Sequence, residues 1–407
     1  MIVNIFIVLC GDFMSKTIFK GFLTNYALKI KNVQNRKSNT KMNLIKTYSI
    51  IAVVASLCRG GGIVFPMENW VSPYFYFMPI FVFVSGYFYK KETDYANLFS
   101  FIKTKFLRLV VPYFIWNLFY GLLNTFFRNI GIINYGDAIS FNSLFIKPWL
   151  NGHQFHFNIP AWFLLSLFVV SVFMYILRKL MKVLHILNEE ALLIITFIIS
   201  IITIYFAEQG YNIGIYLFLA KAGFLLPYFQ LGFIYKKYEN LLSKYRSILL
   251  GFITCCIYIL LVLGGDISVS VVFAQFRGNP LILTALTALK ILSTATICEI
   301  IAPAFEKNSV VRKIGDNTFS IMMHHPIVLF SINLVIYIMS KFINITGFDI
   351  DTFKHTLWYA YPWRDSRIYL FYVILAVFVP VFIKEISNKT ILYIYNLNLS
   401  DKKIGKK

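Results

Sequence analysis

Apolar residues occur along this chain in long blocks that are nearly free of charged side chains. Each block runs for about 18–23 residues, and a helix needs about 20 apolar residues to cross the ~30 Å hydrocarbon core of a bilayer. The breaks between the blocks predict ten membrane-spanning helices. These are 47–66, 70–89, 109–127, 160–177, 190–207, 213–235, 247–264, 281–303, 317–340 and 368–386. The pattern therefore predicts an all-α, polytopic membrane helical bundle.

Basic residues alternate between the predicted loops. One set of alternate segments holds 29 of the 39 Lys and Arg residues, whereas the other loops hold seven. The basic set is 15–46, 90–108, 178–189, 236–246, 304–316 and 384–407. Because cytoplasmic loops are enriched in Lys and Arg, this set and both chain termini are predicted to be cytoplasmic. The same rule accounts for the net charge of +21, so we expect no nucleic-acid partner.

The membrane domain is predicted to span 42–390, between two basic segments. Residues 1–41 form a basic N-terminal extension. They either lie on the anionic lipids of the cytoplasmic leaflet or precede a true translation start at Met42. Residues 391–407 form a basic cytoplasmic tail. The five Cys residues show no metal-ligand spacing, so no metal site is expected.

A basic pair marks the cytoplasmic end of the third predicted span. Lys105 and Arg108 are three residues apart, and residues at this spacing share one face of a helix. Two cations at a water boundary suit a phosphate-bearing ligand. The general enrichment of basic residues beside cytoplasmic helix ends also explains them, so both interpretations stay open.

Two adjacent histidines lie about two turns into the ninth predicted span. His324 and His325 precede Pro326, which frees backbone carbonyl groups one turn back. A histidine inside a span can carry a proton, act as a base or join helices by hydrogen bonding. Adjacent residues of a helix point ~100° apart, so at most one of the two is expected to line a given cavity.

A further charged pair falls at the outer end of the first predicted span. Arg59 is followed by three consecutive glycines and then by Glu68. The glycines permit close helix approach or local unwinding. Arg59 and Glu68 are candidate catalytic residues, or they form a structural ion pair near the outer surface.

Four sequence stretches occur in an informative order. They begin at Met78 (MPIFVFVSGYFYK), Lys105 (KFLRLVVPYFIW), Pro160 (PAWFL) and Ile314 (IGDNTFSIMMHHP). In this order, on ten predicted spans, they resemble the membrane acyltransferase-3 family, particularly its bacterial surface polysaccharide O-acetyltransferase branch. The resemblance covers about 42–386. It implies a ten-helix bundle that moves acyl groups, usually acetyl from acetyl-CoA, onto sugars of surface glycans.

The resemblance also implies site residues. The family's Arg-x-x-Arg motif, which is linked to acyl-CoA, falls on Lys105 and Arg108. A lysine in the first position still serves a phosphate group, although as a point charge. The family's Arg-x10-His motif falls on Lys46, a further candidate for donor binding, and on Leu57. Since leucine cannot transfer a proton, either a histidine of the ninth span is the base or the chain is impaired.

The leading hypothesis is a multi-pass plasma-membrane enzyme that transfers an acyl group, expected to be acetyl, from acyl-CoA to a glycan. The acceptor would be a hydroxyl of a cell-surface polysaccharide, such as a capsule, or of its lipid-linked precursor. Two alternatives remain. A catalytically impaired relative, which Leu57 favours, would bind acyl-CoA or scaffold glycan assembly. A transporter or flippase for a lipid-linked saccharide would bind its substrate without cleaving a thioester.

Overall fold

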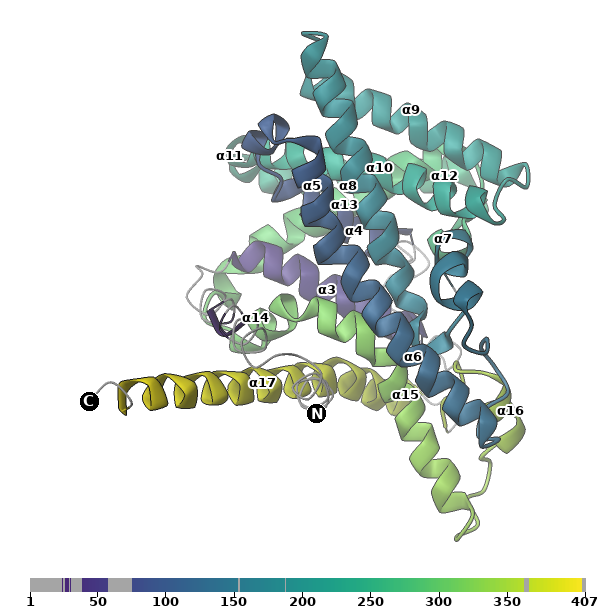
Figure 1. Ribbon diagram of the computed structural model, residues 1–407. Coiled ribbons are helices and arrows are strands. Elements are labelled where there is room, and N and C mark those ends of the chain that lie inside the picture. The colour runs from purple at the N-terminus through teal and green to yellow at the C-terminus, as the bar shows by residue number, and fades with distance from the viewer. Residues whose placement is uncertain are drawn as a thin grey trace.

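The protein is folded almost entirely into helices (Figure 1). The computed structural model describes Thr24 and residues 26–28, 30, 39–57, 75–152, 154–186, 188–361 and 366–404. In this part of the chain, eight helical segments are long and apolar enough to cross a membrane. They are Leu98–Asn129, His156–Val183, Glu189–Glu208, Ile215–Lys237, Arg246–Gly264, Pro280–Phe305, Thr318–Ser340 and Ile368–Asn396. Each overlaps one of the last eight predicted spans, so the predicted all-α polytopic bundle is confirmed.

The first two predicted spans are each represented by one helix. α3 covers Thr40–Leu57 and α4 covers Phe77–Tyr87. Residues 58–74, between them, lie outside the described part of the chain. The count of ten spans and the cytoplasmic position of both termini therefore stay predictions.

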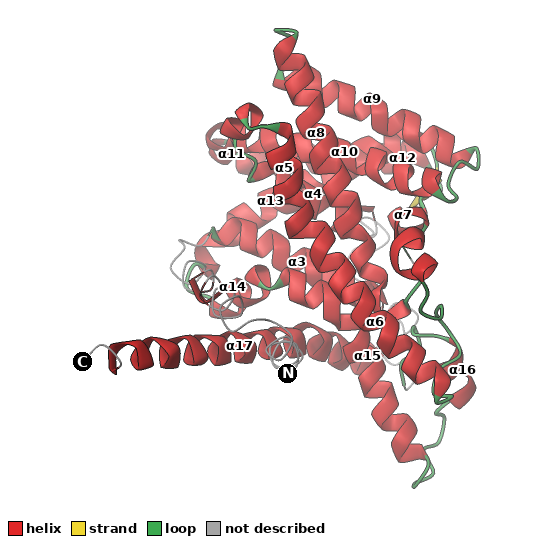
Figure 2. Cartoon of the chain, in the orientation of Figure 1, coloured by secondary structure: helices red, strands yellow, loops and turns green. Residues whose placement is uncertain are grey.

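Asparagine residues begin several of the other helices. Asn97, Asn188, Asn279 and Asn308 accept hydrogen bonds from the first free backbone N–H groups of α5, α9, α13 and α14. The helices after α4 are α5 (Leu98–Lys105), α6 (Val111–Asn129), α7 (Lys147–Leu150), α8 (Trp162–Val183), α9 (Glu189–Glu208), α10 (Ile215–Lys237), α11 (Glu239–Lys244), α12 (Arg246–Gly264), α13 (Pro280–Ile301), α14 (Ser309–Asp316), α15 (Thr318–Ser340), α16 (Ile350–His355) and α17 (Ser366–Ile404). A short antiparallel hairpin pairs β1 (Ser268–Ser270) with β2 (Gln275–Arg277). Helices, drawn in red in Figure 2, make up most of the chain.

α10 is the most enclosed of the eight spans and packs against α4, α8 and α9. Glycines allow its close crossing with α4. A Cβ atom at Gly232 would overlap the carbonyl oxygen of Phe83, and one at Gly86 would overlap the carbonyl oxygen of Phe229. The two backbones are therefore in direct contact, as small residues permit between membrane helices.

The loops that the charge pattern assigns to opposite sides lie at opposite ends of the bundle. In Figure 1, α11 and α14 lie on the left, whereas α7 and α16 lie on the right. The charge pattern predicts that the two long loops 128–159 and 341–367 are outside. They contact each other: the Asn134 backbone N–H donates to the Lys354 carbonyl at 2.8 Å. α17 continues as one helix to Ile404, across the predicted start of the tail at 391 (Figure 1).

A charged cluster joins the predicted cytoplasmic ends of α3, α11 and α13. The Lys41 ammonium lies 2.5 Å from a Glu239 carboxylate oxygen and 3.3 Å from one of Glu299. Glu239 also accepts hydrogen bonds from Lys236 at 2.5 Å and from Tyr87 at 2.8 Å. Burial raises the pKa of Glu239, but the hydrogen bonds from Lys236, Lys41 and Tyr87 outweigh it and hold the pKa below its usual value. The ionised carboxylate thus stabilises this end of the bundle.

Candidate active site

The basic pair lies where its helix changes hydrogen-bond pattern. α5 ends at Lys105, Phe106–Val110 form a π-helical turn, and α6 continues the helix toward the predicted outer side. Single π-helical turns inside α-helices are frequent at functional sites. The Lys105 ammonium lies 5.6 Å from the centre of the Phe101 ring, and Arg108 is exposed. Neither cation is paired with a carboxylate of the described residues, so both are available to an anion.

From that turn outward, α6 carries a line of polar side chains on its buried face. Spacings of four, three and four residues keep these side chains on one face of the helix. They are Tyr113, Asn117, Tyr120 and Asn124, each at most 1% exposed. The exposed positions of the same helix are apolar: Ile115, Leu118, Leu122 and Phe126. Polar side chains inside a membrane face the bundle interior or a hydrated cavity, so this face is a candidate path across the bilayer.

His324 meets this polar face from α15. Its Nδ1 lies 2.7 Å from the Tyr120 hydroxyl, and its ring stands edge-on to Trp116 with 4.4 Å between ring centres. A tyrosine hydroxyl can donate or accept, so the contact allows either tautomer of the imidazole. When the hydroxyl accepts from Nδ1–H, Nε2 keeps a free lone pair. That is the state in which an imidazole serves as a general base.

His325 has different surroundings and a defined tautomer. It is fully buried, and its Nδ1 lies 2.8 Å from the carbonyl oxygen of Ile321. A carbonyl oxygen can only accept, so Nδ1 carries the hydrogen. Nε2 is buried and finds no hydrogen-bond partner among the described residues. The two adjacent histidines thus contact different partners.

Lys46 and Leu57 lie on α3, which has different neighbouring helices from the segment that carries the basic pair. It packs against α4, α13, α14, α15 and α17, whereas the segment that carries Lys105 and Arg108 packs against α8. The Lys46 ammonium lies 3.7 Å from a carboxylate oxygen of Asp316. Leu57 packs against the main apolar core. The structure therefore relates Lys46 to Asp316 rather than to the basic pair.

Two candidate catalytic residues, Arg59 and Glu68, lie outside the described residues. The same holds for His153 and Asp365 of the long outer loops. The roles expected of Arg59 and Glu68 stay predictions.

Comparison with family models identifies an acyltransferase domain. The model of the acyltransferase-3 family matches residues 39–385, which is most of the chain. The chain belongs to the acyltransferase-3 family. Comparisons with curated proteins and with solved structures gave no match. The resemblance found in the sequence is confirmed at the level of the family, and membership supports an acyltransferase activity in a multi-pass membrane protein.

The sequence of this acyltransferase did not reveal which residues contact His324. Tyr120 and Trp116 lie in an apolar stretch in which aromatic residues are unremarkable. The available signal was the regular spacing of Tyr113, Asn117, Tyr120 and Asn124. Polar side chains that recur every three or four residues inside a span lie on one face of the helix. Such a pattern predicts a polar helix face, even without a charged residue.

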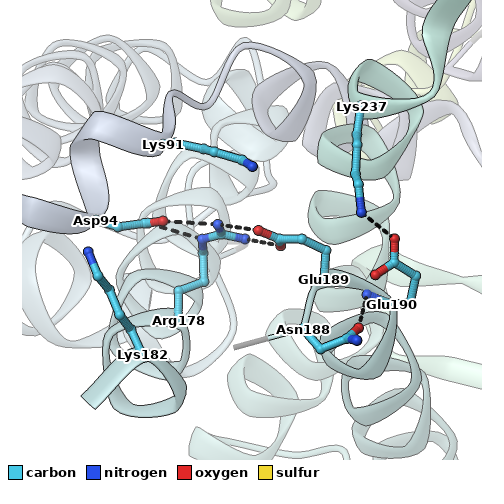
Figure 3. Close-up of a pocket in the computed structure, with 8 residues that line it drawn as sticks. All are labelled: Lys91, Asp94, Arg178, Lys182, Asn188, Glu189, Glu190 and Lys237. Atoms are coloured by element: carbon cyan, nitrogen blue, oxygen red, sulfur yellow. Dashed lines mark hydrogen bonds and ion pairs between the residues drawn. The ribbon is translucent and has the colours of Figure 1, made fainter. Parts of the chain in front are cut away.

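The acyltransferase also has a cavity of about 400 Å³ on its predicted cytoplasmic side (Figure 3). At its base, Arg178 is 1% exposed and donates two hydrogen bonds to Asp94, both of 3.0 Å, and two to Glu189, of 2.7 and 3.0 Å. Gln230 accepts a further one at 3.3 Å. All five N–H groups of the guanidinium are thus used. The cluster joins α8, α9 and α10 and leaves no N–H group of Arg178 for a ligand. The other lining residues are Lys91, Lys182, Asn188, Glu190 and Lys237.

Proposed function

We propose that this protein of the plasma membrane transfers an acyl group, acetyl in the simplest case, from acyl-CoA to a glycan hydroxyl. The acceptor is a cell-surface polysaccharide or its lipid-linked precursor. The observation that carries the proposal is the buried polar face of α6. It starts beside Lys105 and Arg108, reaches His324 and ends at the outer loops. Such a face lets a donor bound from the cytoplasm meet an acceptor bound from outside.

Lys105 and Arg108 bind the phosphate groups of the donor. A hydrogen bond to a charged group contributes roughly 1.5–3 kcal/mol, so two cations without carboxylate partners supply a substantial part of the binding free energy. The thioester end of the donor then extends along α6. From Arg108 to Tyr120 this helix rises by ~18 Å, at 1.5 Å per residue.

His324 acts as the general base. With Nδ1–H donated to the Tyr120 hydroxyl, Nε2 accepts the proton of the acceptor hydroxyl while the hydroxyl oxygen attacks the thioester carbonyl. The carbon–sulfur bond breaks, and the acyl group stays on the acceptor oxygen. The proton passes from the imidazole to the sulfur of CoA. This arrangement supplies the base that Leu57 cannot be.

Leu57 favours a second candidate function. Its side chain packs against the apolar core and cannot exchange a proton. A catalytically impaired relative would bind acyl-CoA or support glycan assembly without turnover. It would retain donor binding at the basic pair and release no CoA.

Donor binding is tested with the double variant Lys105→Ala, Arg108→Ala, purified in detergent. We expect acetyl-CoA affinity, measured by calorimetry, to fall by at least about 100-fold, because two charge-assisted contacts are lost. The fold should survive, since Arg108 is exposed and Lys105 half-buried. Lys103→Ala, an exposed cation of the same helix, is the matched control. Unchanged affinity in the double variant would contradict the donor site. Donor binding without glycan acetylation by the parent would favour the impaired relative.

A further inference from the structure

Buried polar atoms without a hydrogen-bond partner gather around the outer half of α6. The described part of the chain has ten such atoms, and five of them fall between residues 124 and 158. These five are Asn124 Oδ1, Tyr135 Oη, Gln154 Oε1, His156 Nδ1 and Asn158 Oδ1. Buried polar atoms are normally paired, and unpaired ones are especially costly inside a membrane. Their concentration indicates a place that a polar ligand completes.

The orientation of the carboxamides in this group is fixed by one backbone carbonyl. The Leu144 carbonyl oxygen, which can only accept, lies 3.0 Å from Asn117 Nδ2. Asn117 Oδ1 therefore faces the two neighbouring amides, and both must present N–H groups to it. Gln154 Nε2 lies at 2.9 Å from this oxygen and Asn158 Nδ2 at 3.2 Å. Gln154 Nε2 also donates to the Tyr113 hydroxyl at 3.1 Å.

The contacts with Asn117 fix the direction of two hydrogen-bond acceptors, the side-chain oxygens of Gln154 and Asn158. Gln154 and Asn158 are 4% and 3% exposed, and their amide nitrogens are engaged with Asn117. Their carbonyl oxygens remain without a partner among the described residues. Two fixed oxygen acceptors recognise a ligand that presents donors, such as neighbouring hydroxyl groups. An anion or a second acceptor would be repelled.

Aromatic side chains and His156 pack in the same loop as this pair. Tyr135 stacks on His156 with 4.8 Å between ring centres, and Phe157 packs against Phe330 of α15 at 4.9 Å. The turn His156–Ala161, which carries Asn158, packs against both α15 and α6. The acceptors thus belong to a loop that is held against the helix of His324.

The position of Asn117 on α6 also brings the amides close to the proposed base. Asn117 and Tyr120 are successive residues of the buried polar face, ~4.5 Å apart along the helix axis. Tyr120 contacts His324 directly at 2.7 Å. At the outer end of the same helix lies a cavity of about 260 Å³ with polar walls. It is lined by Thr125, Arg128, Asn129, Ile133, Asn134 and Ala138.

We infer that Gln154 and Asn158 form the binding site of the acceptor, where their carbonyl oxygens accept hydrogen bonds from neighbouring hydroxyl groups of a sugar. The inference rests on the proposed function and deepens it, because it names the chemistry that recognises the acceptor. Asn117 holds the two amides in the accepting orientation. The loop between α6 and α8 thereby determines which hydroxyl reaches His324.

The test uses the full-length protein in lipid nanodiscs, with [¹⁴C]acetyl-CoA as donor. The acceptor probe is surface polysaccharide from the source cells, de-O-acetylated with mild alkali. In Gln154→Met and Asn158→Leu, each similar in size to the parent side chain, we expect the acceptor KM to rise roughly three- to tenfold per lost acceptor. The affinity for acetyl-CoA, measured by calorimetry, should stay within twofold of the parent, which also shows that the variants fold.

Ser171→Ala provides a matched control. Ser171 Oγ is likewise buried without a partner among the described residues, but it lies within α8. Its removal should leave the acceptor KM unchanged. Variants at Gln154 and Asn158 that bind donor normally and keep the parental acceptor KM would overturn the acceptor site alone. A parent that shows no polysaccharide-dependent transfer would overturn the proposed function, and this inference with it.

Discussion

At the scale of single residues, the two histidines of α15 differ in what their ring nitrogens can do. His325 uses Nδ1 for a carbonyl of its own helix and is fully buried. His324 is only partly buried and meets the Tyr120 hydroxyl on the polar face of α6. A base must reach the proton it abstracts, so geometry favours His324. If His324 acts as the base, the protein is an active enzyme; if it does not, the protein is an impaired relative.

Removal of the imidazole tests that role. In His324→Ala we expect acetyl transfer to polysaccharide to fall roughly 10²–10⁴-fold, the usual contribution of general acid–base catalysis, with donor affinity retained. Leu57→His should change the rate little, because the base is already supplied by α15. Both rates are measured as CoA release and acetyl incorporation in membranes with equal amounts of each variant.

Two further outcomes separate this prediction from its rivals. Tyr120→Phe keeps the ring but removes the hydroxyl that orients His324, so a smaller loss of rate is expected than in His324→Ala. A Leu57→His variant much faster than the parent would show that the base position of α3 is vacant in the parent. That result would contradict catalysis by His324 and support the impaired relative.

At the scale of elements, the crossing of α4 and α10 holds the centre of the bundle together. The hydropathy pattern predicted both helices but not their contact, because apolar blocks do not specify partners. Gly232 and Gly86 make the contact possible, since a side chain at either position would meet a backbone carbonyl of the other helix. Backbone atoms cannot move aside as the end of a flexible side chain can.

Gly232→Ala is therefore expected to force the two helices apart. Overpacking of this kind costs about 1–3 kcal/mol, so the melting temperature in detergent should fall. Gly251→Ala is the matched control, because a Cβ atom on this exposed position of α12 has no neighbour within 4 Å among the described residues. Alanine has the higher helix propensity, so the control should be as stable as the parent or more so. Equal melting temperatures of Gly232→Ala and Gly251→Ala would contradict the close crossing of α4 and α10.

At the scale of the whole molecule, the sequence predicted what depends on local composition. Apolar block length predicted eight of the spans, six of them within a few residues, and the Lys and Arg pattern separated the loops of the two sides. The segment Leu98–Asn129 begins 11 residues before its predicted start at 109, and Ile368–Asn396 continues 10 residues past its predicted end at 386. Pairings between distant positions could not be predicted. Tyr120 and His324 are 204 residues apart, and the Lys46–Asp316 ion pair likewise joins distant segments. The π-helical turn beside Lys105 has no signature in hydropathy either.

The same charge pattern predicts which side of the molecule faces the cytoplasm. Reporter fusions after Lys91 and Lys237 should show cytoplasmic green fluorescence, because both sites lie in basic loops that are retained on that side. Fusions at Asn142 and Asp351 should show the alkaline phosphatase activity of an outer position. Each site is tested with both reporters, so that poor expression of one fusion is not read as a location.

The fusion at Asp351 is the most informative of the four. This residue lies in α16, in the loop between α15 and α17, and those two helices pack against each other. An outer location at Asp351 is the result expected if both helices cross the membrane and the far end of α17 lies on the cytoplasmic side. A cytoplasmic location would remove this last hairpin and contradict the ten-span count. It would also put the loops around Gln154 on the side of the donor, because Asn134 and Lys354 bond the two loops together. An acceptor approaching from outside could then no longer meet a donor at His324, so this fusion tests the topology on which the proposed transfer depends.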